Sequence, residues 1–105
     1  MKNKISVNLE DFKIILKKTR VSLRIGKKNY ANEMVELSYT EGKFTVEIME
    51  VQRIIEASGT DAWSITMPLS KYQYIIKFKP STDPLIIEFD DELKQLKIGT
   101  TSFKI

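Results

Sequence analysis

The 105-residue sequence contains no cysteine and no histidine. Their absence excludes disulfide scaffolds, thiolate zinc sites, cysteine nucleophiles and every histidine-based triad or metal site. No apolar run approaches the roughly 18 residues that span a membrane, and the lysine-rich start is not followed by the apolar core of a signal peptide. We therefore expect a cytoplasmic protein without membrane contact, and no residue pattern indicates a cofactor or a metal.

Neither sign of charge dominates, because 17 basic side chains stand against 14 acidic ones, for a net charge of +3. With 42% apolar and 30% charged residues, the composition is typical of one ordinary globular domain, which we place over residues 1–105. The charge is unevenly spread, with a net +6 over residues 1–34, −4 over 35–70 and +1 over 71–105. A basic first third can attract polyanions, although a solvated lysine-rich surface explains it as well.

Apolar spacing predicts a strand followed by a helix at the start of the chain. Residues 5–7 alternate apolar and polar side chains, whereas apolar side chains over 9–19 recur every three to four positions. Asn8 is a favourable N-cap, and we expect the helix to end with that range. The sequence does not decide the conformation of residues 20–34. Within this segment, residues 21–25 alternate apolar and polar side chains, as in a short strand.

The same two kinds of spacing continue through the rest of the chain. We expect further strands over 35–39, 44–48, 51–57, 63–67, 85–89, 96–98 and 103–105, and a second helix over 69–76. The acidic residues 90–92 between two strands indicate a turn rather than a metal site. Trp63 alternates with apolar neighbours and is predicted to lie in the core, whereas Tyr74 lies off the apolar face of its helix.

The order of elements restarts after residue 60, which indicates a duplicated unit. An offset of 60 aligns the two strand–helix pairs and gives the identities Ile5/Ile65, Leu9/Leu69, Ile15/Ile75 and Lys17/Lys77. An offset of 50 then aligns the following strands through Leu37/Ile87, Tyr39/Phe89, Val46/Leu96 and Ile48/Ile98. The sequence thus predicts two β-α-β-β-β repeats, over approximately 4–57 and 62–105, with ten extra residues in the first repeat.

A duplicated unit of this kind predicts an α+β fold in which two helices pack on one face of a curved antiparallel sheet, because each helix must bury its apolar side. The polar faces of both helices then lie on the same side of the molecule. That side is basic, since it carries Lys13, Lys17 and Arg20 from the first helix and Lys71 and Lys77 from the second.

Three segments carry a resemblance to a known family: Asn32–Leu37, Glu41–Val46 and Trp63–Leu69. The first two are similar to the first hairpin of a domain of the DNA sliding clamps, the processivity clamps that include the bacterial DNA polymerase III beta subunit. The third resembles the strand that enters the second helix of such a domain. The resemblance covers residues 4–105. In that family six domains close into a ring, with two or three domains in each chain, whereas this chain carries one.

The resemblance implies a function for the basic helix faces. In sliding clamps the helices turn lysine and arginine toward duplex DNA, so Lys13, Lys17, Arg20, Lys71 and Lys77 are the implied contacts to the DNA backbone. The first hypothesis is therefore a non-enzymatic, clamp-like DNA-associated protein, with double-stranded DNA and further copies of the chain as partners. Two alternatives stay open: an interaction module that binds a replication or phage-type protein through a sheet edge without binding DNA, and a small enzyme of unknown class.

Overall fold

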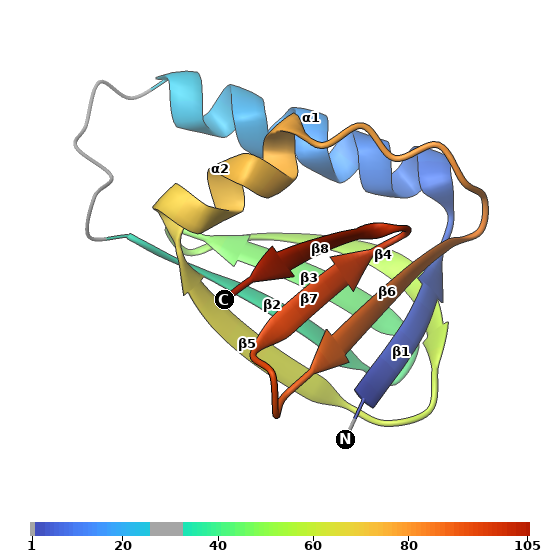
Figure 1. Cartoon of the computed structure of the whole chain (residues 1–105). Helices are drawn as coiled ribbons and strands as arrows, with labels where there is room; N and C mark the ends of the chain where they lie inside the picture. The colour runs from blue at the N-terminus through green and yellow to red at the C-terminus, as the bar shows by residue number, and fades with distance from the viewer. Residues whose placement is uncertain (1, 26–32) are drawn as a thin grey trace.

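The structure is a computed structural model that describes the backbone of residues 2–25 and 33–105 and the side chains of residues 3–19 and 33–105. In these residues, eight strands and two helices follow one another in the order that the apolar spacing predicts (Figure 1). The strands are β1 (Lys2–Val7), β2 (Met34–Thr40), β3 (Lys43–Ile48), β4 (Val51–Gly59), β5 (Trp63–Pro68), β6 (Leu85–Asp90), β7 (Gln95–Ile98) and β8 (Thr101–Lys104). The helices are α1 (Leu9–Ile25) and α2 (Leu69–Lys77).

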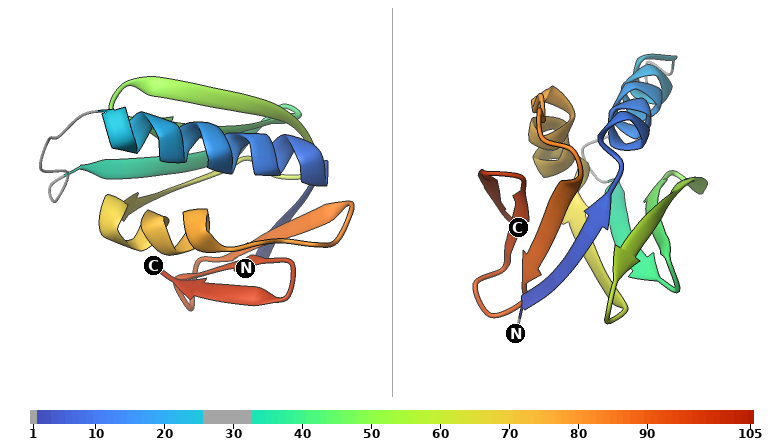
Figure 2. Two further views of the ribbon diagram at one scale, coloured as in Figure 1. Left: turned by 90° about the horizontal axis from the view of Figure 1, so that it is seen from above. Right: turned by 90° about the vertical axis from the view of Figure 1, so that its right-hand side faces the viewer.

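The strands form one antiparallel sheet in the order β5-β2-β3-β4-β1-β6-β7-β8. The sheet curls strongly, and both helices lie along its open side (Figure 2, right). These features confirm the predicted α+β class, with two helices on one side of a curved antiparallel sheet. In this order β1 lies between β4 and β6, and the first and last strands, β5 and β8, form the two edges of the sheet.

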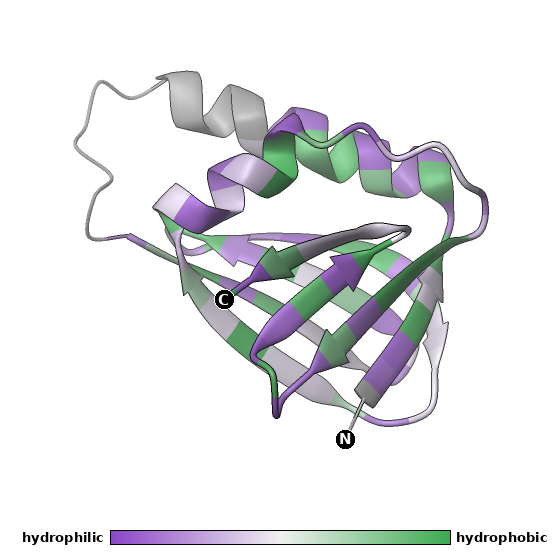
Figure 3. Ribbon diagram, viewed as in Figure 1, coloured by the Kyte–Doolittle hydropathy of each residue, from purple (hydrophilic) through white to green (hydrophobic). Residues whose placement is uncertain are grey.

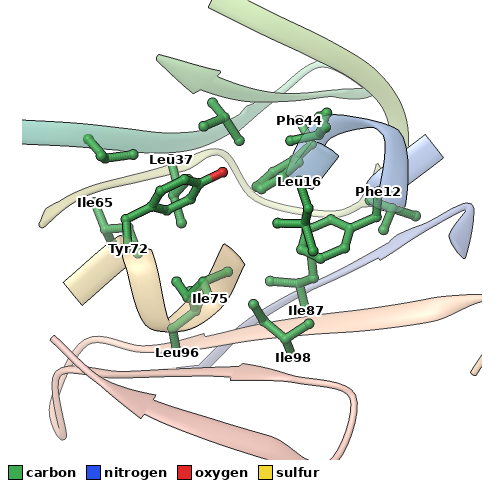
Figure 4. Packing of buried hydrophobic residues seen from close by; sticks show 14 of the residues in the cluster. Phe12, Leu16, Leu37, Phe44, Ile65, Tyr72, Ile75, Ile87, Leu96 and Ile98 are labelled. Atoms are coloured by element: carbon green, nitrogen blue, oxygen red, sulfur yellow. The ribbon is translucent and has the colours of Figure 1, made fainter. Parts of the chain in front are cut away.

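The hydrophobic core lies between the curled sheet and the two helices. Strands turn alternate side chains inward, so hydrophobic and hydrophilic residues alternate along them (Figure 3). Phe12 and Leu16 of α1 and Ile75 of α2 face Ile87 and Leu96 of the sheet (Figure 4). Burying one such side chain contributes about 1.5–3 kcal/mol, so this core determines which sides of the helices stay outside.

Three predictions about single residues are confirmed. The Asn8 side chain caps α1, because its Oδ1 accepts from the backbone N–H of Asp11 at 3.1 Å. Trp63 is buried and stacks on Phe89 with ring centroids 5.9 Å apart. Asp90 forms the predicted turn, since its Oδ1 accepts from the backbone N–H groups two and three positions later, at 3.0 and 3.2 Å.

The first helix is longer than its spacing predicts. It continues to Ile25, so the predicted end at residue 19 and the alternative strand over 21–25 are both wrong. Thr19, at the predicted end, is buried, and its hydroxyl donates to the Ile15 carbonyl at 2.9 Å. A threonine satisfied in this way stays within a helix, and no glycine or proline interrupts the chain from Leu9 onward until residue 26.

The segment 20–34, whose conformation the sequence left open, is described only at its two ends. Residues 20–25 complete α1 and Met34 begins β2, whereas residues 26–32 lie outside the described part of the chain. Neither described helix is long and apolar enough to cross a membrane.

Candidate nucleic-acid interface

The two helices lie side by side and share one exposed surface, which we call the helix face. It consists of Glu10, Lys13, Ile14, Lys17 and Lys18 from α1 and Ser70, Lys71, Gln73, Tyr74 and Lys77 from α2. These positions recur at the three- to four-residue spacing that forms one stripe along a helix. The opposite stripe of each helix is buried, so the helix face is directed away from the sheet (Figure 2).

Charge is segregated between the helices and the remainder of the molecule. Among the described side chains, the helices carry five lysines against two acids, Glu10 and Asp11. The described strands and loops carry seven basic side chains against twelve acidic ones. Within the described side chains, the helices are therefore basic and the strands and loops carry an acidic excess, a distribution that makes the electrostatic potential most positive at the helices.

Four of the five predicted contact residues lie on the helix face. Lys13, Lys17, Lys71 and Lys77 are all exposed there. Arg20 belongs to α1, but its side chain lies outside the described residues. Lys18 is an additional exposed lysine on this face, and its position four residues after Ile14 on the same stripe was the signal that could have identified it.

The two acids of the helices lie in the first turn of α1, where the helix dipole favours negative charge. Glu10 Oε1 is 3.7 Å from Lys13 Nζ, so the charge of this lysine is partly neutralised. Lys17, Lys71 and Lys77 have no acidic residue within one turn of their own helix. These three lysines therefore contribute positive charge to the helix face without an acidic neighbour along their helix.

A buried hydrogen bond fixes the two helices relative to each other. Thr19 Oγ1 and Tyr72 Oη are 3.2 Å apart. The single hydroxyl hydrogen of Thr19 is shared between the carbonyls of Ile15 and Leu16, at 2.9 and 3.1 Å, so the Tyr72 hydroxyl is the donor to Thr19. Burial raises the pKa of Tyr72 to about 12, so this donor stays protonated well above neutral pH. The contact holds the lysines of both helices on one surface.

Two large side chains interrupt the charge of the helix face. Ile14 is 48% exposed and Tyr74 is 69% exposed. Tyr74 thus lies off the apolar side of α2, as the helical spacing predicts. Exposed aromatic groups are enriched at protein–protein interfaces, although single exposed hydrophobic side chains also occur elsewhere on this chain, as at Ile54 and Leu93.

Comparison with known proteins adds no relative, since no protein-family model, no curated protein and no solved structure matches this chain. The candidate interface accordingly depends on the residues of this chain alone. Its strongest feature is the set of lysines that two adjacent helices bring to one side.

Proposed function

We propose that this protein binds the phosphate backbone of duplex DNA through the helix face, as a non-enzymatic protein that resembles one domain of a sliding clamp. The observation that carries the proposal is the segregation of charge among the described side chains, with five lysines on two adjacent helices and an acidic excess on the strands and loops. Duplex DNA carries one negative charge per about 1.7 Å of its axis, and lysines that neutralise phosphates gain affinity by releasing counterions. Lysine suits a contact that slides, because a mobile point charge needs no fixed geometry.

A duplicated unit is part of this proposal, with β1-α1-β2-β3-β4 as one half and β5-α2-β6-β7-β8 as the other. Strand pairing supports it, since β1 pairs with β6 and β5 pairs with β2, which are corresponding contacts between the halves. Burial supports it as well, because both members of the aligned pairs Ile5/Ile65, Leu9/Leu69 and Ile15/Ile75 are buried. The halves differ in their last strands, because β4 pairs with β1 whereas β8 does not pair with β5.

The test is charge reversal on the helix face. The double variant Lys17→Glu/Lys77→Glu removes two of the exposed lysines and adds two repulsive charges. We expect it to bind a fluorescent duplex more weakly in anisotropy titrations, with a plot of log affinity against log salt that is flatter by about 2 units of slope. Unchanged affinity and slope would show that the helix face is not the contact surface.

The matched control reverses two lysines elsewhere. Lys43→Glu/Lys97→Glu changes the net charge by the same amount at exposed positions of β3 and β7. This variant should retain most of the affinity and the salt slope of the wild type, because only long-range charge is altered. Equal losses in both double variants would mean that net charge alone, rather than the helix face, governs the binding.

Self-assembly is the second part of the resemblance to sliding clamps. Six copies of this 12.2 kDa chain have a mass of about 73 kDa. Light scattering over a range of protein concentrations distinguishes such an assembly from a monomer. A hexamer would support a ring that encircles the duplex. A monomer at all concentrations would rule out such a ring, and the proposal would then be limited to DNA contact through a single helix face.

The exposed Ile14 and Tyr74 favour a second candidate, an interaction module whose helix face contacts a protein. Duplex DNA titrations of the wild type and of the variant with both side chains truncated to alanine separate the two candidates. Backbone binding by lysines predicts that Ile14→Ala/Tyr74→Ala binds duplex DNA as well as the wild type does. A protein contact centred on these groups predicts no measurable DNA affinity in the wild type.

A further inference from the structure

Strand β5 is a sheet edge without the usual protection. It pairs with β2 on one side, and its other side has no strand partner in the described sheet. Sheet edges are normally protected by charged side chains, especially lysine, or by proline. Residues 63–67 contain no charged residue, and the single proline, Pro68, stands at the end of the strand. The edge is therefore open to pairing along most of its length.

The backbone groups available at this edge belong to Ser64 and Thr66. The N–H of Leu69 donates to the carbonyl of Glu33 at 3.0 Å, which continues the register between β5 and β2. Residues of an antiparallel pair alternate between bonding to the partner and facing away from it, so residues 63, 65 and 67 bond to β2. Ser64 and Thr66 then direct their N–H and C=O groups away from β2.

A groove runs along the same edge. It consists of two adjoining hollows of about 570 and 410 Å³, which together follow β5 from Trp63 to Met67 and share Ile105. Ser102 and Phe103 of β8 line its far side, and Figure 1 shows the end of β8 opposite β5. An extended segment of five residues is about 16 Å long and matches the length of this edge.

The first strand of the chain shows what covers a corresponding edge. β1 also precedes a helix, and its edge is covered by the end of β4, which pairs antiparallel to it at residues 57–59. β4 has nine residues, whereas β8 has four and does not pair with β5. An extended antiparallel strand is therefore the kind of ligand that fits the edge of β5.

The charge of the groove identifies the kind of strand. Lys71, Lys94 and Lys104 line it together with one acid, Asp91. A second copy of the chain does not complement this charge, since neither of its two edge strands, β5 and β8, carries an acid. We propose that β5 binds an extended acidic segment of a partner protein as an additional antiparallel strand. The backbone contacts of this proposal lie on the sheet rather than on the helix face, and the groove shares Lys71 and Tyr74 with that face.

Two peptides of opposite charge test the proposal. One alternates valine and glutamate over seven residues, the other alternates valine and lysine, and both have blocked ends. In amide NMR titrations, the glutamate peptide should shift the signals of Ser64, Thr66 and the indole N–H of Trp63, and bind at least about tenfold more tightly than the lysine peptide at low salt. Equal binding of both peptides, or shifts confined to other surfaces, would overturn the proposal. Shifts of the edge signals with protein concentration alone would assign the groove to a second copy.

Thr66→Pro and Thr66→Ala form a matched pair at the edge. Both remove the threonine side chain, but only proline removes the N–H that faces the groove, and proline is tolerated on a free edge. We expect Thr66→Pro to bind the glutamate peptide about tenfold more weakly than Thr66→Ala does, while duplex DNA binding is the same in both. Equal peptide affinities would refute strand addition at β5.

A charge-reversal variant keeps the test decisive if Thr66→Pro fails to fold. Lys94→Glu/Lys104→Glu removes two of the groove lysines, and Lys97→Glu is the control at an exposed position outside the groove. The double variant should lose its preference for the glutamate peptide, whereas the control should keep it. A preserved preference in the double variant would contradict an acidic ligand.

Discussion

The buried hydrogen bond between Thr19 and Tyr72 links the two helices, and its removal has a predictable asymmetry. Both side chains are buried, with 3% and 1% of their surface exposed. In Tyr72→Phe the donor disappears, while the Thr19 hydroxyl still donates to the helix carbonyls. This change should cost about 0.5–1.5 kcal/mol, the usual net contribution of one hydrogen bond.

Thr19→Val has the larger expected effect. Valine has the shape of threonine but cannot accept, so the Tyr72 hydroxyl would stay buried without a partner. An unsatisfied buried hydroxyl costs about 1–3 kcal/mol. In the double variant Thr19→Val/Tyr72→Phe both polar groups are gone, and the destabilisation should be smaller than in Thr19→Val alone.

Urea unfolding followed by circular dichroism measures these differences. With a slope of about 1–3 kcal/mol per molar urea, a change of 1 kcal/mol moves the midpoint by about 0.3–1 M, which is readily resolved. The expected order of stability is wild type, then Tyr72→Phe, with Thr19→Val lowest. Additive effects of the two substitutions, or a greater loss in Tyr72→Phe than in Thr19→Val, would refute this account of the contact.

Three further predictions concern stability. Ile15→Ala should cost about 2–5 kcal/mol in urea unfolding, whereas its exposed neighbour Ile14→Ala should change stability by less than about 0.5 kcal/mol; equal effects would mean that the register of α1 is wrong. Because burial raises the pKa of Tyr72 to about 12, the unfolded chain loses this proton first, and stability should fall by up to about 2–3 kcal/mol between pH 10 and 12. Unfolding titrations of Tyr72→Phe should lack that part of the decline, and an identical pH profile would contradict it. Gly59→Ala would place a Cβ 2.7 Å from Ile5 Cγ2, so we expect a loss of about 1–3 kcal/mol in thermal unfolding, and a neutral substitution would contradict this close approach of β4 and β1.

Local periodicity predicted most of the fold, because most of the elements bury one side. The strands around Val35, Phe44 and Leu85 alternate cleanly, and their positions in the structure agree with the alternation. The end of α1 was missed because residues 21–25 fit a period of two, while Leu23 also continues the helical spacing from Leu16 and Thr19. A polar residue within a helix can be buried when its hydroxyl donates to a carbonyl of the preceding helical turn, and residue spacing does not predict such a bond.

In the candidate site, too, local spacing predicted some features, whereas features that depend on long-range contacts were not predicted. Helical spacing predicted that Lys17 and Lys77 point outward, because the buried positions of each helix fix the direction of the others. The open edge at β5 was not predictable in this way. Which strands pair depends on contacts far apart in the chain, and β5 finds its partner β2 while β8 stops short of it.

Our central proposal is that the helix face binds the phosphate backbone of duplex DNA. The most direct measurement is an amide NMR titration of the isotope-labelled protein with a short duplex at low salt, repeated at higher salt. We expect shifts at Lys17, Lys71 and Lys77 and their neighbours in α1 and α2, independent of the DNA sequence, that diminish as salt is added. Shifts confined to the sheet, or none at all, would contradict the claim.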